Sequence, residues 1–220
     1  MIKGVIFDLD GTLLDTVDDI ADSMNFALKS NGFYEYVNDE YKYFVGKGVK
    51  NLVSMVLEDQ TRDQKKHDKV LQMYLKKYAE IQHIKTKAYS GIDQLLIDLS
   101  LRGIQLAVLT NKPDGDSQKI VKRHFPSIPF EMIFGAHEGV PIKPNPTGAL
   151  AILKRFELKP AEVLYVGDTN VDILTAQNAK IPSIGVLWGF RTRGELERAK
   201  ADYIVAHPKE ILEIIKEKNQ

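Results

Sequence analysis

Five short apolar runs recur along the chain, and each has the length of a buried β-strand. They lie at residues 5–8, 104–110, 132–134, 163–166 and 184–187. After residue 90, segments with helical patterns separate these runs. Alternation of buried strands with helices is typical of a parallel sheet with crossover helices. The pattern therefore predicts an α/β fold.

The best-defined helical pattern follows residue 90. Four apolar residues there fall at i, i+3, i+4 and i+7, which is one face of a helix: Ile92, Leu95, Leu96 and Leu99. Gly103 follows as a C-terminal cap. A last helix is predicted at residues 208–220.

Residues 15–88 break the alternation, because no strand-like run occurs there and amphipathic helical patterns follow one another. The first helix shares an apolar face of Ile20, Met24, Ala27 and Leu28, with Thr16 and Asp19 spaced like a capping box. A second long helix is predicted at residues 62–83. We therefore expect a Rossmann-like α/β core domain of residues 1–14 and 89–220, with an inserted helical cap domain of residues 15–88.

Composition narrows the possible partners. The chain of 220 residues has 30 basic and 30 acidic side chains, so no overall field attracts nucleic acid or an anionic membrane. It has no cysteine, which excludes disulfides and thiolate chemistry. We find neither a signal peptide nor an apolar run long enough to span a membrane. We expect a cytoplasmic protein, a monomer or homodimer, that acts on a small molecule.

Polar side chains follow the apolar runs, or lie in loops beside them, at four separate places. These residues are Asp8 and Asp10; Thr110, Asn111 and Lys112; Lys143; and Asp168 and Asp172. In an open parallel sheet, ligands bind at the carboxyl ends of the strands. We therefore expect one site that collects all four places.

The chemistry of that site is suited to phosphate. Several carboxylates make a hard oxygen site for Mg²⁺, and Lys143 and Thr110 supply donors to phosphate oxygens. The nucleophile is either water or Asp8, and Asp10 is placed to protonate the leaving alcohol. Each signal has an ordinary alternative. Asp10-Gly11 is a common turn, and Asp168 with Asp172 is a common acidic pair at a helix start.

The four places together resemble the motifs of one family. The chain is similar to the haloacid dehalogenase-like superfamily, in its phosphatase branch with a helical cap, and within it to the phosphoglycolate phosphatase group. The motifs, in family order, are Asp8-Leu9-Asp10-Gly11-Thr12, Thr110-Asn111, Lys143-Pro144 and Gly167-Asp168-Thr169-Asn170-Val171-Asp172. The resemblance covers essentially the whole chain.

The resemblance implies an Mg²⁺-dependent phosphatase that works through an aspartyl-phosphate. Asp8 would be the nucleophile. Asp10 would be the general acid and base, and would also offer its backbone carbonyl to the metal. Asp168 would be a metal ligand, and Asp172 would hold the groups around the metal. Dehalogenases of the superfamily do not use a residue equivalent to Asp10, so its presence favours phosphate chemistry.

The same resemblance assigns Thr110 and Lys143 to the phosphate group, with Asn111 as a further substrate-binding residue. It matches Gly46-Lys47-Gly48 to a cap loop that meets the substrate, and a plain glycine-rich connection is the alternative. The best candidate substrate is 2-phosphoglycolate, with Lys47 selecting its carboxylate.

Three other functions stay open on the sequence. A β-phosphoglucomutase-like phosphomutase shares the cap and all four motifs, and a pyrophosphatase or nucleotidase would use the same chemistry. A receiver-like signalling module would also use an Asp, a Thr and a Lys. It needs neither a cap nor Asp10, however, so the inserted helices argue against it.

Overall fold

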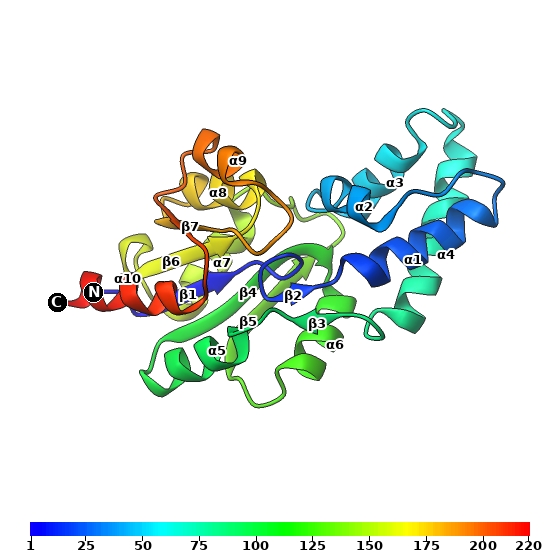
Figure 1. Ribbon diagram of the computed structural model, residues 1–220. Helices are drawn as coiled ribbons and strands as arrows, with labels where there is room; N and C mark the ends of the chain where they lie inside the picture. Colours follow the sequence, from blue (N-terminus) through cyan, green and yellow to red (C-terminus); the bar gives the residue numbers. More distant parts are fainter.

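The computed structural model describes residues 1–220 and is built on a six-stranded parallel sheet (Figure 1). The strands run in the order β5-β4-β1-β6-β7-β8. Their bounds are β1 Gly4–Phe7, β4 Gln105–Pro113, β5 Phe130–Ala136, β6 Val163–Gly167, β7 Ser183–Val186 and β8 Tyr203–Val205. The predicted α/β fold is confirmed.

All five predicted strands are present, with shifted ends. The largest shift is in β4, which the sequence predicts to end at Thr110 and which continues to Pro113. The sheet also has a strand that the apolar pattern does not predict. This is β8, whose three residues are apolar but form a run too short for the pattern to identify as a strand.

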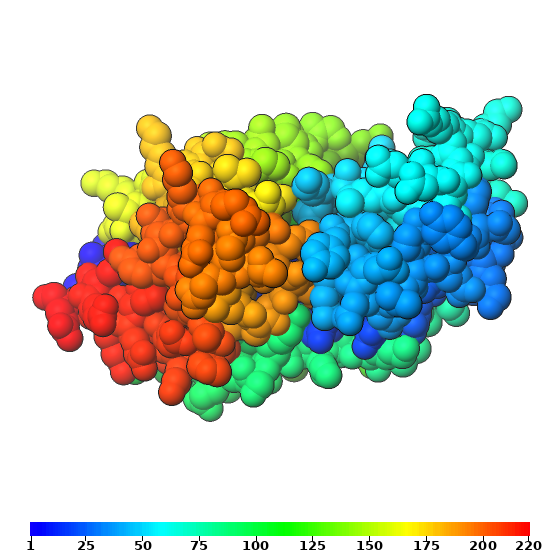
Figure 2. All heavy atoms as spheres, turned by 45° about the horizontal axis from the view of Figure 1, so that its top comes forward, coloured from blue at the N-terminus to red at the C-terminus, as the bar shows by residue number.

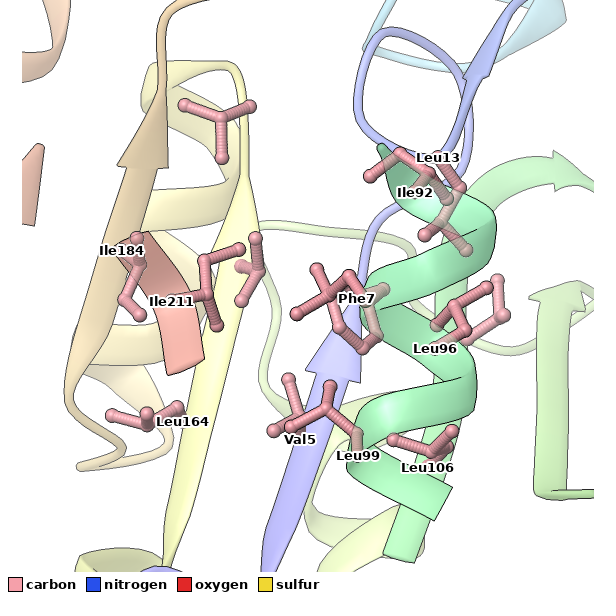
Figure 3. Close-up of a cluster of buried hydrophobic side chains, with 14 of the residues drawn as sticks. Val5, Phe7, Leu13, Ile92, Leu96, Leu99, Leu106, Leu164, Ile184 and Ile211 are labelled. Carbon is pink, nitrogen blue, oxygen red and sulfur yellow. The ribbon is translucent and has the colours of Figure 1, made fainter. Parts of the chain in front are cut away.

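Helices cover both faces of the sheet. On one face lie α5 Ile92–Leu101, α6 Asp114–His124 and α10 Lys209–Asn219, and on the other lie α7 Thr147–Phe156 and α8 Asn170–Asn178. The 3₁₀ turn η1 Pro160–Glu162 leads into β6, and α9 Arg193–Arg198 follows β7. The sheet has a hydrophobic core on each face, and successive residues of β1 point alternately into one and the other. Val5 and Phe7 pack with α5 (Figure 3), and Ile6 packs with α7.

The predicted face of α5 is confirmed, because Ile92, Leu95, Leu96 and Leu99 are all buried. Gly103 follows this helix at φ +70°, in the left-handed conformation that suits a glycine at a helix end. The predicted C-terminal helix is α10.

Four helices project beyond the sheet and pack around a core of their own (Figure 1). They are α1 Val17–Lys29, α2 Asn38–Phe44, α3 Val49–Leu57 and α4 Gln64–Ile81. The short strands β2 Leu14–Asp15 and β3 Lys87–Ala88 pair antiparallel where the chain enters and leaves this group. We call α1–α4 the cap; the division at residues 14 and 89 stays a prediction. No helix in the structure has both the length and the apolar character needed to cross a membrane.

The predicted capping box at the start of α1 is wrong. The Thr16 hydroxyl donates to Oδ1 of Asp10 at 2.8 Å and makes no cap hydrogen bond. The Asp19 carboxylate instead accepts the backbone N–H groups of Lys85 and Thr86, and the Thr86 hydroxyl at 2.7 Å. Asp19 is buried, so these bonds satisfy a charge that water does not reach. These hydrogen bonds join the first turn of α1 to the segment between α4 and β3.

The strand order places the carboxyl ends of three strands together. β1 lies between β4 and β6, and the chain builds the sheet outward from β1 in one direction and then in the other. Such a reversal is the topological switch point at which parallel sheets bind ligands. Asp8, Thr110 and Asp168 lie on or directly after β1, β4 and β6.

Candidate active site

Asp8 lies directly after β1 with its carboxylate buried. Oδ1 of Asp8 accepts the backbone N–H of Leu9 at 2.7 Å, and the ammonium of Lys143 lies 2.7 Å from the same oxygen. Burial raises the pKa of Asp8 well above its usual value, and the charges of Asp172 and Asp168 raise it further, against the opposing effect of Lys143. Asp8 is thus a carboxylate held in place beside a cation.

Asp8 belongs to a cluster of three buried carboxylates with Asp168 and Asp172. One oxygen of each lies within 4.8 Å of the others. Asp172 also accepts the backbone N–H of Thr169 at 3.1 Å and the Thr169 hydroxyl at 2.6 Å, which caps α8. Asp172 therefore both starts a helix and contributes charge to the cluster.

Asp168 is fully buried and is fixed by two donors. The Thr12 hydroxyl lies 3.1 Å from Oδ1, and the backbone N–H of Phe190 lies 2.8 Å from Oδ2. Burial and the charge of Asp172 raise the pKa of Asp168 to about 7. Gly11 has φ +87°, and a Cβ there would come within 2.4 Å of Oδ2 of Asp168. Only glycine allows the first motif to turn this close to the acid.

The cluster has the chemistry of a divalent metal site. Three carboxylates with one ammonium leave two negative charges when all are ionised. The raised pKa values of Asp8 and Asp168 show that this anionic state is costly in the protein alone. Carboxylate oxygens are the ligands that Mg²⁺ prefers. These residues therefore fit a hard divalent cation, which would balance the charge.

Lys143 is the buried cation of the site. Its ammonium lies 2.7 Å from Oδ1 of Asp8 and 2.7 Å from Oδ1 of Asp172. Burial by itself lowers the pKa of Lys143, but the charges of Asp172 and Asp8 outweigh it and raise the pKa well above its usual value. Lys143 is therefore charged at any pH at which the protein works.

Asn111 positions the loop that carries Lys143. Its Oδ1 accepts the backbone N–H of Lys143 at 2.8 Å, and its Nδ2 donates to the Lys143 carbonyl at 3.1 Å. The same Nδ2 donates to the carbonyl of Gly46 in the cap at 3.0 Å. Asn111 thus joins the cap loop to the Lys143 loop, with its side chain engaged by backbone groups.

Asp10 has different partners from Asp8. Nζ of Lys112 lies 2.9 Å from Oδ1 and 3.0 Å from Oδ2 of Asp10, and the Thr16 hydroxyl also donates to Oδ1. The Asp10 carboxylate is not one of the three in the acidic cluster. The two carboxylates of the first motif therefore pair with different lysines, Asp8 with Lys143 and Asp10 with Lys112.

A cavity of about 50 Å³ lies between the sheet and the cap. Its core side is formed by Asp8, Asp10, Thr110, Asn111, Lys112, Pro113, Asp116 and Lys143, and its cap side by Ile20, Val45, Gly46, Gly48, Val49, Leu52, Tyr74, Leu75 and Tyr78. Lys47 is exposed and is not among these residues. Asp168 and Asp172 are fully buried and also do not line the cavity.

The sequence analysis places Lys112 in the expected site but gives it no role, and it does not predict the polar lining residues Tyr74, Tyr78 and Asp116. The sequence carries a signal for Lys112, because residues two apart on a strand point to the same face and Thr110 is in the second motif. The two tyrosines belong to the buried face of α4, and nothing in their spacing separates a cavity wall from an ordinary core.

Comparison with known proteins agrees with the motifs. The model of a family described as haloacid dehalogenase-like hydrolase matches residues 5–186. A phosphoglycolate phosphatase from Aquifex aeolicus is 32% identical over 214 residues, which are 97% of this chain and 97% of that protein. A phosphoglycolate phosphatase from Nitrosospira multiformis is 30% identical over 93% of this chain and 91% of its own length.

Solved structures show the same fold. The crystal structure of a candidate phosphoglycolate phosphatase from Lactobacillus delbrueckii subsp. bulgaricus has a TM-score of 0.92 at 31% identity, and the match covers 97% of this chain and 98% of that one. A predicted phosphoglycolate phosphatase from Haemophilus somnus has a TM-score of 0.89 at 26% identity, over 97% and 98% of the two chains. The protein therefore belongs to the haloacid dehalogenase-like hydrolase family and is an enzyme of its phosphatase branch.

Proposed function

We propose that this enzyme hydrolyses a small phosphate monoester, with 2-phosphoglycolate as the best candidate, through an aspartyl-phosphate on Asp8. The observation that carries the proposal is the Asp8 carboxylate in the cavity wall, 2.7 Å from the Lys143 ammonium. A carboxylate and a cation placed side by side provide a nucleophile and a partner for phosphate oxygens at the same point.

The reaction needs two displacements at phosphorus. In the first, an Asp8 oxygen forms a bond to phosphorus as the bond to the ester oxygen breaks, and Asp10 gives a proton to the leaving alcohol. In the second, Asp10 takes a proton from water, which attacks phosphorus and frees Asp8 and inorganic phosphate. Thr110 and Lys143 line the same cavity and would hold phosphate oxygens in both steps.

A divalent cation, Mg²⁺ in our proposal, would be held by Asp8 and Asp168, by the backbone carbonyl of Asp10, and with Asp172 close by. When bound, it would offset the negative charge that otherwise repels a phosphate dianion from the three carboxylates. The chain's own residues then orient the phosphate. Lys143 stays beside Asp8, and Asn111 holds the Lys143 loop in place.

The choice of 2-phosphoglycolate is supported by the relatives. Those that match over nearly the full length are named phosphoglycolate phosphatases.

A phosphate-release screen tests the proposal. Its substrates are 2-phosphoglycolate, β-glucose 1-phosphate, pyrophosphate and nucleotide monophosphates, each assayed with Mg²⁺. We expect the highest kcat/KM for 2-phosphoglycolate. Isomerisation of β-glucose 1-phosphate that needs a bisphosphate activator and releases no phosphate would instead identify a phosphomutase. Release of phosphate only from pyrophosphate or nucleotides would overturn the choice of substrate.

A further inference from the structure

Lys112 is a buried cation in the cavity wall that the proposed reaction does not use. Its side chain is 4% exposed, and its ammonium contacts both oxygens of Asp10. The ammonium also lies 4.6 Å from the centre of the Tyr78 ring. An ammonium has three N–H donors, and the two contacts to Asp10 leave one donor unused.

The second observation is Tyr78, a residue that lines the cap side of the same cavity. Tyr78 is 2% exposed, and its hydroxyl oxygen has no hydrogen-bonding partner in the protein. Buried hydroxyls are nearly always paired, because leaving one unpaired costs free energy. Burial, with the charges of Asp10 and Asp116, raises the pKa of Tyr78 well above its usual value. The hydroxyl is therefore a neutral donor.

We propose that Lys112 and Tyr78 form the site for a carboxylate of the substrate, remote from the phosphorus, and so determine specificity. A carboxylate has two acceptor oxygens, and the wall offers two donors for them: the remaining ammonium N–H of Lys112 and the Tyr78 hydroxyl. This inference rests on the proposed function, since the phosphate is placed at Asp8 and Lys143.

The lining has two cations, Lys112 and Lys143, and three carboxylates, Asp8, Asp10 and Asp116. Lys143 lies beside Asp8, where the phosphate is placed, so Lys112 is the other cation that a second anionic group can meet. Both lysines are buried, and burial strengthens an ion pair.

The two anion sites lie close together. Lys112 contacts Asp10, which is two residues from Asp8 in the first motif, so both anion sites border one cavity. We therefore assign the substrate class as short phosphorylated carboxylic acids. Sugar phosphates and nucleotides have no carboxylate for Lys112.

The test compares a substrate with a carboxylate to one without it. The variants are Lys112→Met and Tyr78→Phe, and the substrates are 2-phosphoglycolate and ethyl phosphate, a close match that lacks the carboxylate. We expect Lys112→Met to lower the kcat/KM ratio between these substrates by about tenfold to a hundredfold, the range for a hydrogen bond to a charged group. Tyr78→Phe keeps the ring and loses the hydroxyl, so a severalfold decrease of the ratio is expected.

Two further variants sharpen the result. Lys112→Arg keeps the charge and should retain most of the ratio that Lys112→Met loses. Lys119→Met is the matched control, since Lys119 is an exposed lysine on α6 and should leave both substrates unaffected. If Lys112→Met fails to fold, the Tyr78→Phe ratio still decides.

Failure of this inference differs from failure of the proposed function. An enzyme that hydrolyses both substrates, with a ratio unchanged in Lys112→Met and Tyr78→Phe, overturns the carboxylate site alone. A decrease of the ratio in Lys47→Met, without one in Lys112→Met, would overturn it in favour of the exposed cap lysine. Absence of phosphate release from every substrate by the unmodified enzyme would overturn both proposals.

Discussion

The ammonium of Lys143 joins the carboxylates of Asp8 and Asp172, at 2.7 Å from each, and so links the residue after β1 to the first turn of α8. All three side chains of this linkage are buried. The cation therefore holds the proposed nucleophile at a fixed position before any substrate arrives. One ammonium balances one of the three carboxylate charges in the cluster, so two negative charges need a further cation.

Replacement of Asp8 by Asn tests the nucleophile. Asn has nearly the same shape but cannot form an acyl-phosphate, so we expect turnover to fall by roughly a thousandfold or more, as when a nucleophile is removed from other enzymes. The fold should be kept, because the change removes a charge whose burial is already costly. Phosphate release and a thermal melt are the measurements. Appreciable turnover in Asp8→Asn would refute the assignment.

Replacement of Asp10 by Asn tests the proton donor separately. An alkyl ester leaves as an alkoxide that needs a proton, whereas p-nitrophenolate leaves without one. We therefore expect kcat on ethyl phosphate to fall at least tenfold more than kcat on p-nitrophenyl phosphate. Equal losses on the two substrates would show that Asp10 does not donate the proton.

Removal of the metal should abolish activity. Exhaustive treatment with EDTA is expected to stop phosphate release, and added Mg²⁺ is expected to restore it, because the cluster is too anionic to admit a phosphate dianion without a cation. The midpoint of thermal unfolding should also rise with Mg²⁺, since a ligand that binds only the folded state stabilises it. Full activity after chelation would contradict the metal dependence.

Replacement of Asp168 by Asn should change how stability depends on pH. The pKa of Asp168 is about 7 in the folded protein, well above the value of an unfolded aspartate, so folding favours the protonated carboxyl. Its contribution to stability is fully present below about pH 4 and is lost as pH rises through 7. Asn does not titrate and avoids this loss.

In metal-free buffer, Asp168→Asn should therefore melt near the unmodified protein at pH 4 and at least about 3 °C above it at pH 8. Added Mg²⁺ should reverse the order at pH 8, because only the unmodified protein keeps the proposed metal ligand. A melting difference that stays constant between pH 4 and pH 8 would show that Asp168 does not titrate in this range.

The apolar pattern was sufficient for the sheet and for the principal helices, because long periodic segments bury one face whatever their neighbours. It was insufficient for β8, whose three residues are stabilised by pairing with β7. It was wrong about Thr16 and Asp19. Their spacing is that of a capping box, but both side chains bind residues outside α1. Thr16 donates to Asp10, and Asp19 accepts from Thr86.

The site residues likewise divide into those that the sequence predicts and those that it does not. Asp8, Thr110, Lys143 and Asp168 could be placed from the sequence because each follows a strand or adjoins one, and parallel strands bring their carboxyl ends together. The pairing of Lys112 with Asp10 could not be predicted from the sequence, since it depends on the side-chain direction at the end of a strand. The place of Tyr78 in the cavity lining could not be predicted either, because Tyr78 belongs to the cap.

The last prediction concerns the loop between β7 and α9, which contacts both the acidic cluster and the cap. The backbone N–H of Phe190 donates to Asp168 at 2.8 Å, while the Phe190 ring packs in the cap core. The next residue, Arg191, donates to three backbone carbonyls at the end of α2, those of Lys42, Tyr43 and Val45. In Figure 2 the orange segment that contains this loop lies against the blue part of the cap.

Because cations stabilise the carboxyl ends of helices, Arg191 should hold α2 and the cap loop after it against the core. We expect Arg191→Met to speed amide hydrogen exchange in residues 42–48 and to raise KM severalfold, since the cap forms one wall of the cavity. Arg193→Met is the matched control, because Arg193 is 55% exposed and contacts only Glu197 on its own helix. The metal-dependent rise in melting temperature should persist in Arg191→Met, since Phe190 still binds Asp168. Unchanged exchange in residues 42–48 would show that Arg191 does not hold the cap.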